Sequence, residues 1–399
     1  MTGWNRAIEI MCVEMKAKKI LLISHSCQTA NEGQQRAQAL GSIPDIDLTV
    51  LTPDRWNEYG QWRTPEVPLG QSYSFEVGRV RLPWTGPAQW YLHHYPKLAS
   101  TLRRLKPDII DLWEEPWGLV SAHTCWLRGR LLPATKVLVE TEANINRTHP
   151  FPFSNFREYS MNSAHYAVCR QTEGVKVLRE RGYHGPVEVI GNAVDDEIFR
   201  RMDGDACKRK LGLSGFVAGY VGRMVEEKGL IDILNAAKYC PEDISFLFVG
   251  SGPLQPVLEK RFAECGLAER VRFMPARAMR DLPEVINAMD VLLLVSRTTV
   301  TWKEQFGRVI IEAHACGRPV LGSSSGAIPE VIDQGGIVVP ERDAAGIANA
   351  LRRLKDAPRL CMELGNIGLL QVKRKYTWKR VAEQFADVYR KMHCEYACC

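Results

Sequence analysis

Two carboxylates, Glu304 and Glu312, stand eight residues apart in a segment whose residue pattern predicts a strand, a loop, a helix and a second strand. The apolar run 291–295 predicts the first strand. The helix is expected over about 307–316, because a glycine and then a proline follow it. Eight helical residues rise by about 12 Å, so one extended ligand could contact both carboxylates. A pair of solvated helix charges is the alternative interpretation.

Two cations in a glycine-rich turn form the second group suited to chemistry. Arg223 and Lys228 stand between Gly222 and Gly229, after the apolar run 217–221 and before a predicted helix. Backbone N–H groups, the positive end of the helix and two cations would converge there, and such an arrangement binds phosphate. A solvated basic turn is the alternative.

Further polar residues follow predicted strands in the N-terminal half. Glu114 and Glu115 come directly after a strand predicted over 108–113, where they could hold sugar hydroxyls or act as a base. A charged turn before a proline is the alternative for this pair. Gly33 opens a predicted helix and could let the backbone approach a phosphate, although an ordinary turn glycine explains it equally well.

The elements that must position these residues alternate between strand-like and helix-like runs, as in doubly wound parallel sheets. The chain has 399 residues, 45% of them hydrophobic, which is enough for two domains of ordinary size. The segment 52–86 is rich in Pro, Trp and Gly, so a loop or hairpin is expected there rather than a helix. A helix is expected over 156–167, followed by a strand around 167–169.

Composition limits the partners and the compartment. The net charge of +6 is mild for this length and suits an anionic ligand or a lipid surface, and no basic run typical of nucleic-acid binding is visible. The 12 cysteines form no CxxC pair, which indicates reduced thiols. No signal-peptide core and no long apolar span are visible. We therefore expect a cytoplasmic protein, and peripheral contact with the inner face of a membrane is compatible with this expectation.

The segment around Glu304 resembles the retaining glycosyltransferases of GT-B family 4. The E-x7-E pair is followed in order by Cys316-Gly317-x-Pro319 and by Gly326-x-x-Pro329-Glu330. The resemblance covers nearly the whole chain and is strongest from 222 to 330. It implies an α/β fold of the GT-B type, in which two Rossmann-like, doubly wound domains face a central cleft.

The resemblance also implies a division of the chain. It predicts an N-terminal acceptor-side domain over 1–190, a C-terminal domain that binds the nucleotide sugar over 195–375, and a terminal helix over 376–399 that crosses back to the N-terminal domain. The hinge would be Gly191-Asn192-Ala193-Val194-Asp195, which is similar to the N-G-V-D turn of the family.

In this family a hexosyl unit moves from a nucleotide diphosphate sugar to a hydroxyl of a glycan, lipid-linked or small-molecule acceptor, with retention of configuration. The resemblance assigns the diphosphate to Arg223 and Lys228, the sugar hydroxyls to Glu304 and the ribose to Glu312. Because two cations would balance the charge of the leaving group, neither a metal nor a cofactor is expected. Further donor contacts are implied for Gly33, Gly222, Gly250, Gly252, Arg277, Phe306, Gly307, Arg308 and Val309.

The acceptor side departs from the family pattern. Many relatives carry a histidine after the strand predicted over 136–140, where this chain has Glu142 and Asn144. The double glycine that relatives often have near Gly33 is a single glycine here. Two other functions remain open: a sugar-nucleotide epimerase of the same fold, and a non-catalytic protein that binds a sugar nucleotide.

Overall fold

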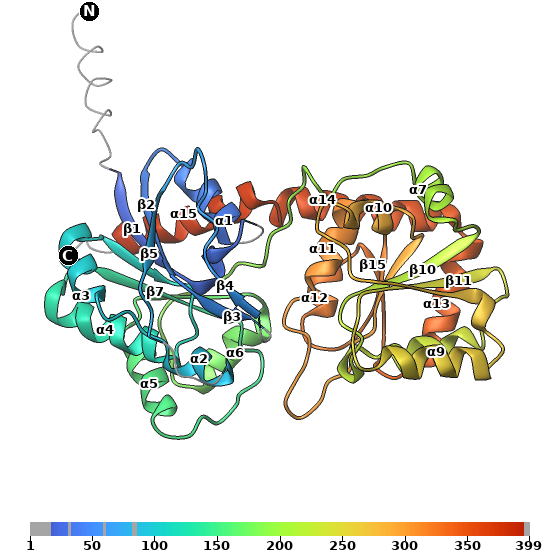
Figure 1. The fold of residues 1–399 in the computed structure, drawn as a ribbon, viewed down its shortest axis with the longest axis horizontal. Helices are drawn as coiled ribbons and strands as arrows, with labels where there is room; N and C mark the ends of the chain where they lie inside the picture. Colours follow the sequence, from blue (N-terminus) through green and yellow to red (C-terminus); the bar gives the residue numbers. More distant parts are fainter. Residues whose placement is uncertain (1–16, 31–32, 59–60, 82–85, 395–399) are drawn as a thin grey trace, which may run out of the picture.

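The computed structural model describes residues 17–30, 33–58, 61–81 and 86–394. The main strands form two parallel sheets, each covered by helices, and the two resulting domains lie side by side (Figure 1). Within these ranges no helix is both long and apolar enough to cross a membrane.

The first sheet has seven strands in the order β5-β2-β1-β6-β7-β8-β9, and every neighbouring pair is parallel. Alternate residues of β1 enter two different cores, with Ile20 and Leu22 on one face and Leu21 and Ile23 on the other. The strands are β1 (Lys18–Ile23), β2 (Ile46–Pro53), β5 (Ser74–Gly78), β6 (Ile109–Leu112), β7 (Lys136–Thr141), β8 (Tyr166–Cys169) and β9 (Val187–Val189).

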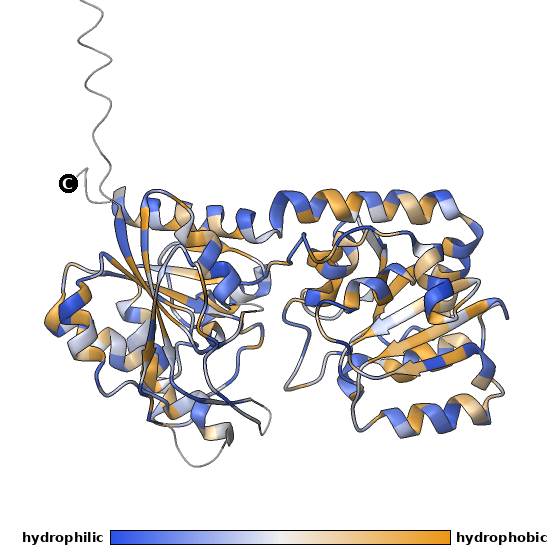
Figure 2. Ribbon diagram, turned by 45° about the horizontal axis from the view of Figure 1, so that its top comes forward, coloured by the Kyte–Doolittle hydropathy of each residue, from blue (hydrophilic) through white to orange (hydrophobic). Residues whose placement is uncertain are grey.

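The second sheet has six parallel strands in the order β12-β11-β10-β13-β14-β15. In both sheets the strands are mostly apolar, whereas the helices carry polar residues among apolar ones (Figure 2). The strands are β10 (Phe216–Val221), β11 (Ile244–Val249), β12 (Val271–Met274), β13 (Val291–Leu294), β14 (Val320–Ser323) and β15 (Gly336–Val339).

Helices cover both faces of each sheet. Those of the first domain are η1 (His25–Gln28), α1 (Gly33–Gly41), α2 (Gly86–Leu92), α3 (Leu98–Leu105), α4 (Leu119–Leu131), α5 (Phe153–Ser163) and α6 (Thr172–Glu180). Those that follow in the chain are α7 (Gly204–Leu211), η2 (Glu226–Lys228), α8 (Leu230–Ala237), α9 (Gln255–Glu264), η3 (Ala268–Arg270), α10 (Leu282–Asn287), α11 (Arg308–Ala315), α12 (Ile328–Ile332), α13 (Ala344–Asp356), α14 (Pro358–Lys375) and α15 (Trp378–Cys394).

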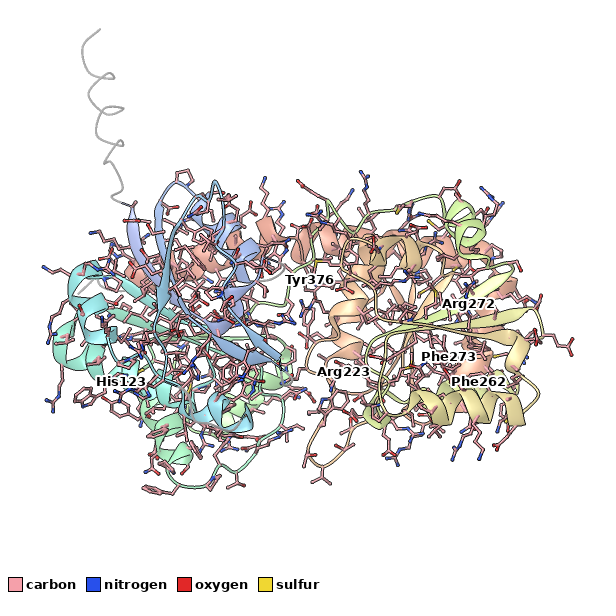
Figure 3. The ribbon with its side chains drawn as sticks, viewed as in Figure 1. His123, Arg223, Phe262, Arg272, Phe273 and Tyr376 are labelled. Carbon is pink, nitrogen blue, oxygen red and sulfur yellow. The ribbon has the colours of Figure 1, made fainter. Side chains whose placement is uncertain are left out.

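The chain passes between the domains twice, and the two passages lie next to each other. Val194 forms an isolated bridge with Thr377, and its N–H donates to the carbonyl of Tyr376, which lies between the domains in Figure 3. After this point α15 returns to the first domain, where Phe385 and Tyr389 are fully buried in its core.

A network of buried charges lies under α15. Arg36 is 2.7 Å from both Asp111 and Glu140, Arg170 also pairs with Glu140, and the Tyr389 hydroxyl donates to Asp111 over 2.7 Å. All five residues are buried. Removing one partner from such a network typically costs about 3–5 kcal/mol, because a charge remains buried without compensation. The network therefore fixes the end of β7, from which a cleft loop departs.

Two segments differ from the sequence-based expectation. The segment 52–86 contains the expected hairpin, β3 (Trp56–Glu58) with β4 (Gln61–Arg63), but also β5, which pairs with β2 as the edge strand of the sheet. The helix expected over 156–167 occupies Phe153–Ser163 instead. The strand expected around 167–169 is present and fully buried as Tyr166–Cys169. Only the boundary between the helix and this strand was misplaced, because a short apolar run does not by itself show where one structure ends and the other begins.

Candidate active site

Four loops meet at one edge of the second sheet. The loops after β12, β11, β10 and β13 carry Arg277, Gly250, Arg223 and Ser296, and these strands are neighbours in that order. Because all the strands are parallel, their carboxyl ends lie on the same side. The structure thus brings together residues that are up to 73 positions apart in the sequence.

Two glycine turns pack directly against each other at this edge. Gly222 has φ +151° and Gly250 has φ +140°, conformations that other residues rarely adopt. A Cβ atom on Gly250 would lie 2.0 Å from the carbonyl oxygen of Gly222, and one on Gly252 would lie 2.3 Å from that of Met224. The close packing of the two turns therefore requires glycine at these positions. Both turns lie at the carboxyl ends of their strands, where ligands bind in sheets of this kind.

Arg223 lies on the side of the second domain that faces the first (Figure 3). Its side chain is exposed, while its carbonyl accepts a hydrogen bond of 2.7 Å from Tyr220. The Tyr220 contact fixes the backbone and leaves the guanidinium accessible. Arg277 is exposed in the same way at the next loop but one.

Lys228 and Glu304 form an ion pair in the cleft. The Lys228 Nζ lies 2.7 Å from Glu304 Oε2, which also accepts a hydrogen bond of 2.8 Å from Ser296. The Trp302 ring lies 4.9 Å from the same ammonium. The two charged side chains are only 15% and 9% exposed, so their interaction is screened less than a surface pair would be. In the described part of the chain, Glu304 Oε1 has no partner.

The backbone of Glu304 is held by both domains. Its carbonyl accepts hydrogen bonds from Asn144 Nδ2 (2.8 Å) of the first domain and from the Ala327 N–H (3.0 Å) of the second. Gly326 has φ +53°, and a Cβ there would lie 2.1 Å from the same carbonyl oxygen. The position of Glu304 therefore depends on contacts from both domains.

The helix that carries Glu312 begins as the sequence predicts. Gly307 is its N-cap with φ +79°, and Arg308 and Glu312, four residues apart, share one face of α11. The side chain of Phe306 is turned away from this face, since it is 4% exposed and packs on Tyr376 at 5.7 Å in the hinge. The side chain of Phe306 is thus not available to a ligand, and only its backbone could contact one.

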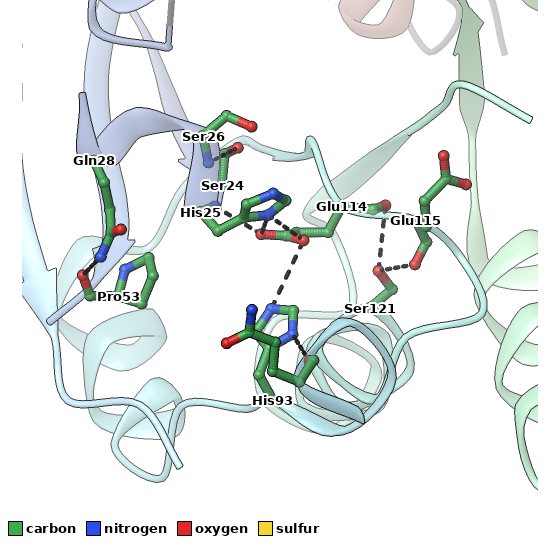
Figure 4. Close-up of polar contacts among 10 residues, drawn as sticks. Ser24, His25, Ser26, Gln28, Pro53, His93, Glu114, Glu115 and Ser121 are labelled. Carbon is green, nitrogen blue, oxygen red and sulfur yellow. Dashed lines mark hydrogen bonds and ion pairs between the residues drawn. The ribbon is translucent and has the colours of Figure 1, made fainter. Parts of the chain in front are cut away.

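Figure 4 shows that the paired carboxylates of the first domain have different environments. Glu114 is 5% exposed, contacts His25 Nδ1 at 2.8 Å and lies 3.7 Å from His93. Burial alone would raise the pKa of Glu114, but the charges and hydrogen bonds of His25 and His93 outweigh burial and hold it well below its usual range. Glu114 is therefore ionised, buried and already paired with two histidines.

Glu115 points the other way, into a cavity of about 290 Å³ between the domains. Its carboxylate accepts hydrogen bonds of 2.8 Å from Thr141 and from the Glu142 N–H. Burial raises the pKa of Glu115 to about 7. The cavity is lined by Tyr91, Glu115, Trp117, Ala143, Asn144, Ile145, Arg147 and His149 of the first domain and by Trp302, Lys303 and Gln305 of the second.

The other two residues expected near the cleft have structural contacts. The Glu142 carbonyl accepts a hydrogen bond of 3.2 Å from Gln305, which adds a second link between the domains. Gly33 begins α1 against the loop after β1, and a Cβ there would lie 2.5 Å from the Ser26 carbonyl oxygen. This close approach accounts for a glycine without a phosphate, so a donor contact of Gly33 remains a prediction.

Several residues of the site have no signal in the sequence motif. Ser296 directly follows the apolar run 291–295, so the rule that ligands lie beyond strand ends could have found it. His25 and His93 are 89 and 21 positions from Glu114, and no local pattern connects them to it. Trp302 stands in an irregular loop whose course the sequence does not fix.

Comparison with known proteins shows that the sequence is similar to one class of enzymes, the glycosyltransferases. Residues 215–356 match the family described as glycosyl transferases group 1. D-inositol 3-phosphate glycosyltransferase of Streptomyces bingchenggensis is 32% identical over 312 residues, which cover 71% of this chain and 67% of that protein. Alpha-D-kanosaminyltransferase of Streptomyces kanamyceticus is 30% identical over 178 residues, 43% of this chain and 45% of that protein.

Solved structures share the fold. Sucrose-phosphate synthase of Thermosynechococcus elongatus superimposes with a TM-score of 0.73 at 21% identity, covering 95% of this chain and all of that one. HepE of Anabaena in complex with UDP gives 0.72 at 18% identity, covering 94% and 100%. The expected GT-B fold of two Rossmann-like domains is confirmed. The chain belongs to the glycosyl transferases group 1 family and is a glycosyltransferase, which decides against the epimerase and the non-catalytic binding protein.

The raised pKa of Glu115 gives a prediction for stability. The folded protein holds this proton more tightly than the unfolded chain does, so the wild type should lose free energy of unfolding as the pH rises from 4.5 to about 7. Glu115→Gln has no titrating group there and should lack this loss. Urea unfolding of both proteins at several pH values measures the difference between them. A difference that does not change with pH would contradict the raised pKa.

Proposed function

We propose that this glycosyltransferase moves a hexosyl unit, with retention of configuration, from a nucleotide diphosphate sugar to a hydroxyl of an acceptor in the cavity beside Glu115. The observation that carries the proposal is the ion pair of Lys228 and Glu304, which lies in the cleft next to two glycine turns and Arg223. A cation held in a poorly solvated cleft is suited to a diphosphate.

The difficulty of the reaction is the charge on the leaving group. As the bond from the anomeric carbon to the diphosphate breaks, negative charge grows on the departing oxygen, and Arg223 and Lys228 stabilise it. Glu304 Oε2 orients Lys228, which leaves Oε1 for a hydroxyl of the sugar. Retention places the acceptor on the face from which the diphosphate leaves. The acceptor proton therefore passes to the departing phosphate oxygen as the new bond forms.

The comparisons support a nucleotide sugar without naming it for this chain. HepE, of the same fold, was solved with UDP and with UDP-glucose. We therefore propose a uridine diphosphate sugar as the first donor to test. Glu312 would contact the ribose, and the glycine turns would approach the diphosphate with Gly222, Gly250 and Gly252. Within the described residues no group of three or more His, Cys, Asp and Glu side chains could hold a metal ion. In the proposed mechanism Arg223 and Lys228 balance the charge of the leaving diphosphate.

Thermal unfolding with a panel of nucleotide sugars tests the donor. At a concentration of 100 times Kd, a bound donor adds about 2.7 kcal/mol to the free energy of unfolding, which is readily visible as a melting shift. We expect a shift with at least one nucleotide diphosphate sugar and, with that donor, transfer or slow hydrolysis. Failure of the whole panel to stabilise the protein would contradict the proposal.

Substitution of the two cations should lower kcat more than donor affinity, because the charge they stabilise is complete only when the diphosphate departs. Lys228→Met should reduce kcat by roughly 10² to 10³. Arg223→Lys should remain impaired, since one ammonium cannot replace a bidentate guanidinium on phosphate. Lys238→Met, an exposed lysine at the end of α8, is the matched control.

Steady-state transfer with and without EDTA completes this test. Wild-type activity should survive chelation. Activity that is lost with EDTA and restored by Mg²⁺ or Mn²⁺ would overturn the metal-free mechanism, and a nearly normal kcat in Lys228→Met would remove this residue from the site.

The ribose assignment of Glu312 makes a separate prediction for binding. A charged hydrogen bond contributes on the order of 1.5 to 3 kcal/mol, so Glu312→Ala should bind the free nucleoside diphosphate about tenfold or more weakly. Glu304→Ala should weaken binding of the same diphosphate much less than Glu312→Ala does, because Glu304 acts on the diphosphate only through Lys228 and its own proposed partner is the sugar. Calorimetric titration measures both, and unchanged affinity in Glu312→Ala would refute the assignment.

A further inference from the structure

The cavity beside Glu115 has a positively charged wall. Arg147 and His149 line it, and Arg157 of α5 and Arg181 at the end of α6 stand behind them. Arg157 NH1 lies 3.3 Å from His149 Nδ1, and Arg181 donates to the carbonyl of Arg147. Three guanidinium groups and one imidazole thus form a single group at the cavity, called the arginine cluster below.

The histidine of the arginine cluster does not add a charge. A guanidinium has only hydrogen-bond donors, so the Nδ1 atom that faces Arg157 must accept and the proton must lie on Nε2. Burial and then the charges of Arg157, Arg181 and Arg147 lower the pKa of His149 to about 4. The Trp117 ring stacks on this imidazole at 5.4 Å, which keeps it in place.

No carboxylate balances the three arginines at close range. In the part of the chain that the structure describes, none of them has an ion pair within 4.0 Å. Glu158 and Glu180 act on Arg157 and Arg181 only from a greater distance, and Glu180 accepts a hydrogen bond from Asn146. Glu173 is paired with Lys303, and Glu115 lines the same cavity but has no ion pair within 4.0 Å with any of the three arginines.

Such an arrangement costs free energy in the empty protein. Arg157 and Arg181 are half-buried, and burial lowers the pKa of both, with the charge of Arg157 as a further cause for Arg181. Loop packing alone explains the contacts of Arg181 and Arg157. Arg147 differs from them, because its exposed side chain lines the cavity and has no hydrogen bond or ion pair in the described chain, which leaves its guanidinium available to a ligand.

From this geometry we infer that the acceptor carries an anionic group, a phosphate or a carboxylate, which binds Arg147. In the same cavity Glu115 would contact the hydroxyl groups of the acceptor. The inference rests on the proposed function, because it names the substrate class of the same acceptor site. The aromatic wall of Tyr91 and Trp117, whose rings are 4.5 Å apart, suits the C–H face of a sugar or cyclic polyol. A ring of this kind with one acidic substituent would pack on the aromatic wall and place its charged group beside Arg147.

Calorimetric titration with three probes tests the inference: glucose, glucose 6-phosphate and glucuronate. We expect at least one anionic probe to bind about tenfold or more tightly than glucose, because a charged hydrogen bond to a guanidinium adds this much. The advantage should shrink as the salt concentration rises. A response to both anions indicates selection by charge, and a response to one of them identifies phosphate or carboxylate as the group.

Arg147→Gln is the decisive variant. Its side chain is exposed and its contact with Arg181 uses only the backbone, so the fold should persist, and the preference for the anion should fall about tenfold. Arg103→Gln, which removes an exposed arginine from α3, should keep the full preference. Equal affinity of wild type for glucose and both anions, no response to either anion, or an unchanged preference in Arg147→Gln would each overturn the inference.

Titration with uridine diphosphate separates this result from the proposed function. This ligand binds the other domain, so it should bind wild type and Arg147→Gln equally. If it binds while the anionic probes show no advantage over glucose, only the acceptor inference fails. If it does not bind, the proposed donor fails, whatever the probes show.

Discussion

The cleft depends on one partly buried ion pair. Lys228 comes from the turn after β10 and Glu304 from the loop after β13, and their 2.7 Å contact holds a cation where a diphosphate would lie. The carbonyl of the same glutamate is bound by Asn144 across the cleft and by Ala327 within its own domain. One residue therefore links the charge of the proposed donor site to the loop of the first domain that we propose for the acceptor.

Buried residues of the first domain fix the loop whose Asn144 binds the carbonyl of Glu304. Glu140, at the end of β7, is held by Arg36 and Arg170, and the loop that contains Asn144 begins two residues later. The C-terminal helix adds Tyr389 to the same network. Since breaking a buried pair costs several kcal/mol, the acceptor loop leaves from a rigid base. The exact position of Glu304 thus depends partly on buried residues that no substrate would contact.

Local signals in the sequence predicted several features of the second domain. The glycine turn around Arg223, the start of α11 at Gly307 and the strand 291–295 all follow from periodicity and from residues that favour positive φ. These features depend on neighbours in the chain, so one sequence reveals them. The order of the strands then places the loops together without further information.

Contacts between distant segments could not be predicted in the same way. Glu114 and Glu115 look equivalent in sequence, but His25 and His93 reach the first and leave the second in the cavity. The arginine cluster joins the loop after β7, helix α5 and the end of α6, and only the packing of these segments brings its members together. Side chains that meet through tertiary packing carry no spacing rule, which explains why the acceptor side was the less predictable half.

A double-mutant cycle on Lys228 and Glu304 tests the central claim that the pair acts as one unit. It compares kcat for donor turnover in wild type, Lys228→Met, Glu304→Gln and the double variant. If the carboxylate acts by holding the cation, the second substitution should add little to the first, with a coupling of at least about 1 kcal/mol. Losses that add within about 0.3–0.5 kcal/mol would show that the two residues act independently and would contradict this account.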